Sequence, residues 1–257
     1  PGTPFFSSIP FGMTSYEQDA WLRYGGGNEL WRELYEPFNL IPVRGGNSGV
    51  QMFGWFNKEI NSLEDLQGLT MRIPSLGGEV FRRAGGVPVT MQVSEVFTAL
   101  QTGALDATEF VSPYNDLAAG YHTVAEYYYY PGWHEPGSTL ETIFNKEKFE
   151  SLPKDLQEIL MAGTEIMNQL LLDELMAKNN EALRVLVEEH GVQLRKLPND
   201  VLTELHRISE DVVSEMSSVD EQTAKVYESW KNFRDNVINY NRIAEEAFIE
   251  ARNLPLN

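Results

Sequence analysis

Short apolar runs alternate with helix-like patterns through the first half of the chain. Six runs predict strands, at residues 40–43, 51–56, 71–73, 87–91, 104–111 and 127–130. Between and before them, apolar residues recur every three or four positions, which predicts helices at residues 14–24, 28–38, 77–84 and 94–101. Strands that alternate with helices in this way are typical of α/β layers.

The second half of the chain is mostly helical. Pro153 stands in the first turn of a predicted helix that continues to Gly191, a strand follows at residues 192–197, and Asn199 begins helices that extend to about Arg252. Near the end, alternating steps of four and three separate a set of apolar residues: Val226, Trp230, Phe233, Val237, Tyr240, Ala244, Ala247 and Ala251. This spacing is typical of a packed helical seam, which lies either against its own domain or against a partner chain.

Composition narrows the classes of protein. The 257 residues are 42% hydrophobic and 11% aromatic, values of a folded chain with one large domain or two modest lobes. Asp and Glu number 38 against 20 Lys and Arg, so the net charge of −18 opposes nucleic acid and anionic membranes, although a buried Arg can still bind a small anion. Cysteine is absent, which excludes disulfides and thiolate zinc sites. The chain opens at Pro1 without Met or a leader, so we expect that any targeting signal has been removed or lies upstream.

The usual signatures of metal hydrolases and of nucleotide binding are missing from the sequence. The four histidines are scattered, and Ser138 occupies the position of the second His that an HExxH motif needs after His134 and Glu135. No GxGxxG, GxxxxGK[ST] or GxSxG motif is present. The glycine-rich residues 45–49 are either a connection between strands or a phosphate cradle.

Polar residues at the ends of predicted strands are the candidates for a binding site, because open α/β sheets bind their ligands there. Arg72 lies inside an apolar run, where its guanidinium either meets an anion or points from an edge strand to solvent. Glu109 and Glu135 follow two further runs. From the residues alone, these two carboxylates are an acid/base pair, a site for a hard cation, or solvated strand ends.

Several spaced motifs follow one another along the chain, at residues 11–13, 20–21, 25–27, 45–52, 54–56, 69–73, 99–103, 106–110, 127–133 and 135. Together they resemble the motifs of the substrate-binding proteins of TRAP transporters, within the branch that binds 2-oxo acids and related monocarboxylates with a cation. The resemblance covers essentially the whole chain. Members of the family are longer, and the opening βαβ segment that they have before the position of Pro1 is absent here.

The resemblance implies a role for each candidate. Arg72 is implied to form a salt bridge with the substrate carboxylate, which suits a planar guanidinium that stays charged when buried. Gln51, Glu109 and Glu135 are implied to ligate or support the cation, and Phe110 to offer its backbone carbonyl. All are oxygen donors, which suit Na⁺ or Ca²⁺.

Three of the aligned positions also bear on the substrate pocket. Gln51 and Phe110 belong to it by resemblance, and relatives often have Trp where this chain has Phe110, a departure that affects the shape of the pocket more than the cation site. Trp133 is implied to wall the pocket, with an ordinary core position as the alternative.

The fold implied by the resemblance is α/β, two-lobed and like that of periplasmic binding proteins. We expect interleaved lobes, with residues 1–40 and 112–198 in one lobe and contributions from residues 40–111 in the other. Long C-terminal helices at residues 199–252 complete the chain, and the seam on them implies a homodimer formed by exchange of the C-terminal helix.

The function implied is capture, in the periplasm, of a small 2-oxo or 2-hydroxy carboxylate such as pyruvate or lactate, together with Na⁺ or Ca²⁺. The ligand would pass to the TRAP membrane permease without a chemical step. A metal-dependent enzyme acting on the same acid, with Glu109 or Glu135 as base, is the alternative. A ligand-sensing domain of a regulator is disfavoured, because the chain has no helix-turn-helix and no basic patch.

Overall fold

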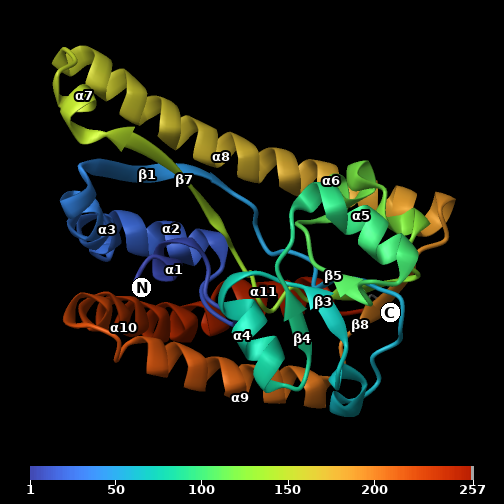
Figure 1. The fold of residues 1–257 in the computed structure, drawn as a ribbon. Coiled ribbons are helices and arrows are strands. Elements are labelled where there is room, and N and C mark those ends of the chain that lie inside the picture. The colour runs from blue at the N-terminus through green and yellow to red at the C-terminus, as the bar shows by residue number, and fades with distance from the viewer. Residues whose placement is uncertain (256–257) are drawn as a thin grey trace.

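A computed structural model describes residues 1–255 of the chain and contains two sheets surrounded by helices (Figure 1). The strands are β1 (Leu40–Asn47), β2 (Gly54–Phe56), β3 (Thr70–Arg72), β4 (Val87–Val89), β5 (Ala107–Thr108), β6 (Tyr127–Tyr130), β7 (Thr139–Asn145) and β8 (Gln193–Lys196). The helices are α1 (Pro4–Ser7), α2 (Ser15–Tyr24), α3 (Gly27–Tyr35), α4 (Ser75–Arg83), α5 (Val93–Thr102), α6 (Pro113–Ala119), α7 (Lys146–Glu150), α8 (Lys154–Arg184), α9 (Asn199–Met216), α10 (Glu221–Ile243) and α11 (Glu245–Arg252).

The larger sheet has six short strands in the order β4-β3-β5-β2-β6-β8. The pairs β4–β3, β3–β5 and β6–β8 are parallel, whereas β2 is antiparallel to both of its neighbours, β5 and β6. One face packs on α4 and α9 around Met71, Phe81 and Leu205. The other face packs on α5 and the end of α8 around Trp55 and Leu186. The sheet is therefore buried on both faces, as its nearly continuous apolar strands require.

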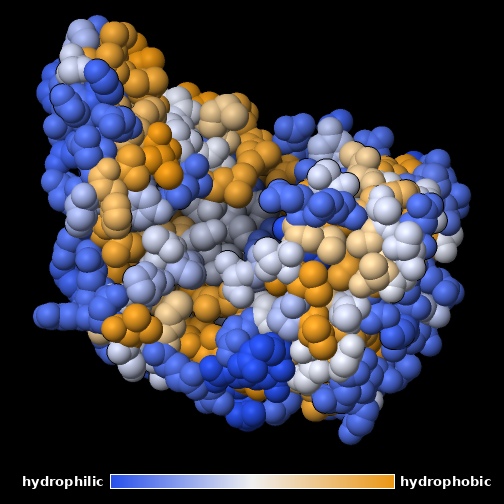
Figure 2. Space-filling model, viewed as in Figure 1, coloured by the Kyte–Doolittle hydropathy of each residue, from blue (hydrophilic) through white to orange (hydrophobic). Residues whose placement is uncertain are grey.

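The smaller sheet is the antiparallel pair of β1 and β7, with the long helix α8 lying along β1 (Figure 1). Arg44 on β1 is almost fully buried and fixes this contact, because it pairs with Asp19 of α2 at 3.2 Å and with Glu165 of α8 at 2.5 Å. Many apolar side chains of this region stay exposed, among them Ile159, Ile166, Met167, Leu170 and Met176 of α8. Figure 2 shows orange atoms over the projecting part of the molecule that holds α7 and the start of α8.

The N-terminal helices α1–α3 pack against α10 in a third apolar cluster. Val226 and Trp230, the first two residues of the predicted seam, are buried there, so this half of the seam packs inside its own fold. Tyr240, further along, is 63% exposed. The predicted long helix is interrupted at Ala244, whose backbone (φ −110°, ψ −94°) separates α10 from α11.

The strands and helices predicted from periodicity are confirmed, except that the sequence reading missed α1, α6, α7 and β7. The division of the chain into lobes at about residues 40, 112 and 198 stays a prediction. Among residues 1–255, none of the helices combines the length and the apolar character needed to cross a membrane.

Candidate functional site

Four of the predicted site residues come from neighbouring strands of the six-stranded sheet. Arg72 ends β3, Glu109 directly follows β5, and Glu135 lies beyond β6. Because β3, β5 and β6 point the same way, these residues meet where the carboxyl ends of the three strands lie, which we call the carboxyl edge of the sheet. Gln51 precedes the antiparallel strand β2 and therefore enters from the same edge. The carboxyl ends of parallel strands are where α/β sheets usually bind ligands.

Backbone contacts hold these segments together before any side chain contributes. The Gln51 amide donates to the Glu135 carbonyl at 3.2 Å, the Met52 amide to the Val111 carbonyl at 3.1 Å, and the Glu109 amide to the Arg72 carbonyl at 3.1 Å. Gly54 is required beside them, because its φ is +131° and a Cβ there would collide with the Thr108 carbonyl. The sequence Gly54-Trp55-Phe56 thus lets β2 approach the segment that carries Glu109.

Arg72 and Glu109 form an ion pair at the centre of the site. The Glu109 side chain is only 2% exposed and that of Arg72 is 17% exposed, so the pair is largely removed from water. The other oxygen of Glu109 lies 3.5 Å from Nε2 of His134. A buried carboxylate is stable only with such partners, because an unpaired charge in a low-dielectric interior is strongly unfavourable.

Glu135 lies next to this pair and has neutral partners instead. Its Oε2 accepts hydrogen bonds from Nε2 of Gln51 and from the hydroxyl of Ser138, both at 2.6 Å. Burial raises the pKa of Glu135 and is the largest influence on it, while the nearby His134 lowers it and the carboxylate of Glu109 raises it. A group that adds positive charge between the two carboxylates would relieve their repulsion.

The remaining two predicted residues occupy different surroundings. Phe110 follows Glu109 directly, and its ring packs edge-on against Tyr121 at a centroid distance of 5.6 Å. Trp133 is 3% exposed and lies between Phe11 and Phe53 in the core of the sheet. This is the position expected for the core alternative, and contact of the Trp133 ring with a substrate stays a prediction.

The donor set fits a hard cation. Oε1 of Gln51 is buried and has no hydrogen-bond partner, which leaves a free amide oxygen on the side chain that donates to the Glu135 carboxylate. Two carboxylates and an amide oxygen suit Na⁺ or Ca²⁺. Within residues 1–255, no group of three or more His, Cys, Asp or Glu residues has the arrangement of a metal site, so a cation here needs the amide, a backbone oxygen or the substrate as further ligands.

Sequence reasoning missed three residues that contact the predicted ones. His134 is buried against Glu109, and neither of its ring nitrogens has a hydrogen-bond partner. Ser138 donates to Glu135, and Ser48 accepts from Nε2 of Gln51 at 3.3 Å. The positions of these residues in the sequence gave a signal, since each lies within three positions of a candidate.

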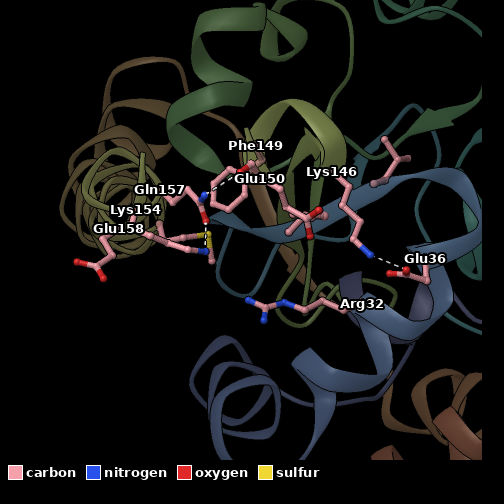
Figure 3. A pocket seen from close by; sticks show the side chains of 11 residues that line it. Arg32, Glu36, Lys146, Phe149, Glu150, Lys154, Gln157 and Glu158 are labelled. Carbon is pink, nitrogen blue, oxygen red and sulfur yellow. Dashed lines mark hydrogen bonds and ion pairs between the residues drawn. The ribbon is translucent and has the colours of Figure 1, made fainter. Parts of the chain in front are cut away.

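A cavity of about 610 Å³ lies away from this site, between α3, the start of β1, α7 and the start of α8 (Figure 3). Two of its charged side chains, Lys146 and Glu36, form an ion pair at 2.5 Å. Lys154 reaches Gln157 at 3.2 Å. The cavity contains none of the predicted site residues.

Comparison with known proteins gives the site its context. Residues 3–220 match the bacterial extracellular solute-binding proteins of family 7. A monocarboxylate 2-oxoacid-binding periplasmic protein of Nostoc sp. is 41% identical over 96% of this chain and 68% of its own length. The C4-dicarboxylate-binding periplasmic protein DctP of Rhodobacter capsulatus is 28% identical over 69% of this chain, which spans 53% of that protein.

Two solved structures resemble the fold closely. A TRAP periplasmic solute-binding protein of Pseudoalteromonas atlantica with bound sodium and pyruvate is 39% identical, with a TM-score of 0.92 over 96% of this chain and 75% of its own. That of Colwellia psychrerythraea, with bound calcium and pyruvate, is 38% identical, with a TM-score of 0.93 over 97% of this chain and 76% of its own. The predicted two-lobed α/β fold is thereby confirmed.

Proposed function

Because the chain belongs to family 7 of the bacterial extracellular solute-binding proteins, we propose that it captures a small 2-oxo or 2-hydroxy carboxylate, pyruvate or lactate, together with Na⁺ or Ca²⁺. Family members are extracytoplasmic components of transport and not enzymes, so the predicted location outside the cytoplasmic membrane is confirmed and the metal-dependent enzyme is set aside. Relatives with bound sodium or calcium and pyruvate support the choice of ligand and cation.

The observation that carries the proposal is the meeting of one guanidinium, two carboxylates and an unpartnered amide oxygen at a single sheet edge. In the proposed complex, Glu109, Glu135, Oε1 of Gln51 and the carbonyl of Phe110 hold the cation. Arg72 binds the substrate carboxylate, because its planar guanidinium matches two carboxylate oxygens with parallel hydrogen bonds. Gln51, Phe110 and Trp133 shape the pocket around the rest of the acid.

Glu109 links the two binding events. Its carboxylate pairs with Arg72 and is therefore a competitor of the substrate carboxylate for the same guanidinium. When Glu109 instead contacts a cation, Arg72 is released to pair with the acid. Two unit charges about 4 Å apart interact by about 4 kcal/mol at an effective dielectric of 20, enough to decide whether an acid binds. By linkage, the acid must tighten cation binding by the same factor.

Calorimetric titration of pyruvate, with and without added Na⁺ or Ca²⁺, tests this scheme. Glu135→Gln is expected to weaken pyruvate binding sharply and to abolish its dependence on the added cation. Arg72→Lys, which loses the planar two-point contact, is expected to weaken binding about tenfold while keeping that dependence.

Two surface substitutions serve as matched controls. Glu64→Gln and Arg82→Lys make the same changes of side chain at exposed positions. They should leave the pyruvate affinity unchanged, both with and without added cation. An undiminished pyruvate affinity in cation-free wild type would show that the carboxylates are no part of the binding site. A parallel titration with lactate in place of pyruvate identifies the preferred acid.

We also propose that the captured acid is delivered to a TRAP membrane permease.

We further propose that the chain forms a homodimer through α10 and α11. Ile243 and Phe248 on these helices are 80% and 64% exposed, which leaves apolar area for a partner. A mixed occupancy dimer of a TRAP solute-binding protein of Bordetella bronchiseptica, 34% identical with a TM-score of 0.94 over 98% of this chain, supports the dimer. Charges at Ile243 and Phe248 should convert a dimer to monomer in light scattering; a monomeric wild type would refute it.

A further inference from the structure

Asp116 is a fully buried carboxylate in α6 that the proposed binding scheme does not use. Its Oδ2 accepts hydrogen bonds from Nε1 of Trp55 at 3.0 Å and from the hydroxyl of Tyr128 at 2.7 Å. Its Oδ1 accepts from the backbone amide of Val111 at 3.2 Å. Burial is the dominant influence and raises the pKa of Asp116 to about 7. Burying a carboxylate in a core costs free energy, so we expect its position to serve a role.

The three donors belong to the three segments that carry the site. Trp55 of β2 and Tyr128 of β6 are paired across the strands, and their rings stack at 4.1 Å with an interplanar angle of 16°. Gln51 precedes β2, and Glu135 follows β6. Val111 directly follows Glu109 and Phe110. One side chain thus connects β2, β6 and the segment after β5.

The segment after β5 is the one that most needs this support. β5 itself is only Ala107–Thr108, and the Glu109 amide continues its ladder to β3 by one hydrogen bond, to the Arg72 carbonyl, so Phe110 and Val111 lie beyond that ladder. Beyond it, the Val111 carbonyl accepts from the Met52 amide, and the Val111 amide donates to Asp116. Both backbone polar groups of Val111 are therefore hydrogen-bonded. The carbonyl accepts from Met52 in the segment before β2, and the amide donates to Asp116.

We propose that Asp116 is a positioning residue for the cation site, whose bond to the Val111 amide fixes where the Glu109 carboxylate and the Phe110 carbonyl lie. The inference rests on the proposed function for the identity of the ligand, but the positioning itself is a property of the chain. Groups that orient metal ligands from outside typically change metal affinity by roughly 10–100-fold when they are replaced.

Asp116→Asn and Tyr128→Phe form a matched pair of variants. Asparagine has one acceptor oxygen where Asp116 has two. Trp55 and Tyr128 both donate to one oxygen of the carboxylate and Val111 alone donates to the other, so the amide oxygen stays with the first two donors and the amide N–H turns toward the Val111 amide. Tyr128→Phe removes one buried hydrogen bond from the same carboxylate but leaves the Val111 contact in place. Both variants lose stability, and only the first disturbs the segment after β5.

The test measures Ca²⁺ affinity by calorimetry and unfolding by urea for the wild type and both variants. Asp116→Asn should weaken Ca²⁺ binding at least tenfold, while Tyr128→Phe, at a similar loss of stability, changes it by less than about twofold. Hydrogen exchange of the peptide spanning residues 107–113 should accelerate in Asp116→Asn without the same acceleration elsewhere. Equal Ca²⁺ affinities in the two variants at equal stability would overturn the proposal.

The exchange measurement separates this proposal from the proposed function. If the wild type binds neither Ca²⁺ nor Na⁺, the proposed function fails, and exchange at residues 107–113 alone decides whether Asp116 positions the segment. Equal protection of that peptide in Asp116→Asn and Tyr128→Phe would then exclude a positioning role.

Discussion

The six-stranded sheet and the β1–β7 pair bury their side chains to very different degrees. Trp55, Met71 and Tyr128 in the large sheet have no exposed surface, because helices cover both of its faces. In the β1–β7 region, Leu140 and Ile143 of β7 remain 49% and 45% exposed. The chain thus completes one core within itself and leaves the other region open.

The location of the charged groups follows the same division. In the large sheet, Glu109 and Asp116 are buried carboxylates with defined partners. In the β1–β7 region the buried Arg44 pairs with Glu165 of α8, whose side chain is 40% exposed. The pair of Arg184 with Glu188 at the end of α8 stays at the surface. A binding site needs groups held in place by rigid surroundings, and the region that is covered on both faces offers them. We therefore expect perturbations of the large sheet to have large effects and those of α8 small ones.

The largest expected effect is a dependence of stability on pH that comes from Asp116. Because its pKa in the folded state, about 7, lies above the ordinary 3.8, its contribution is fully present below about pH 4 and is lost as the pH rises through 7. Three pKa units correspond to roughly 4 kcal/mol. The difference in the free energy of unfolding between wild type and Asp116→Asn should fall by up to this amount between pH 4 and 8 in urea titrations.

If the free energies of unfolding of wild type and Asp116→Asn differed by the same amount at every pH, the result would contradict that expectation. Glu64→Gln, at an exposed carboxylate, provides the control and should follow the wild-type curve throughout.

Truncation of one methionine in each region gives a second, smaller effect. Met71→Ala removes a fully buried side chain from β3 and should lower the free energy of unfolding by about 3 kcal/mol. Met176→Ala removes a side chain of α8 that is 74% exposed and should change it by less than about 0.5 kcal/mol. Chemical denaturation measures both, and equal losses would show that the two regions are equally well packed.

Removal of one arginine in each region should give the smallest of these effects. Arg72→Met leaves Glu109 buried without its cationic partner and should cost about 2 kcal/mol, a value below that of fully buried pairs because Arg72 is partly exposed. Added Ca²⁺ should restore part of the loss in thermal melts. Arg184→Met on α8 should leave the melting temperature unchanged with or without Ca²⁺. If added Ca²⁺ raised the melting temperature of both variants by the same amount, the result would contradict binding of the cation by Glu109.

Periodicity predicted most of the strands and helices, and it failed at β7 and at the short helices α1, α6 and α7. The strands around Met71 and Tyr128 are continuous apolar runs that stand out from their surroundings. β7 has its apolar residues at Leu140, Ile143 and Phe144, which is the i, i+3, i+4 spacing of a helix and not the alternation of a strand. The seven-residue helix α6 is too short for a periodic signal.

The residue types of the site could be predicted, but its pairings could not. Arg72, Glu109 and Glu135 stand at strand ends in the sequence, which was enough to select them. The ion pair of Arg72 with Glu109 depends on β3 and β5 being neighbours in the sheet, and that order is a tertiary property. The bond between Asp116 and the Val111 amide likewise exists only once α6 is folded onto the sheet.

The central claim is that the acid and its cation bind at the edge of the six-stranded sheet and not in the cavity beside α7. A crystal structure of the protein with pyruvate and Ca²⁺, with the anomalous signal of calcium, tests it most directly. We predict one calcium peak in contact with Oε1 of Gln51 and the carboxylates of Glu109 and Glu135, with pyruvate on Arg72. Calcium or pyruvate in the cavity lined by Arg32, Lys146 and Lys154, with Arg72 still paired to Glu109, would contradict the claim.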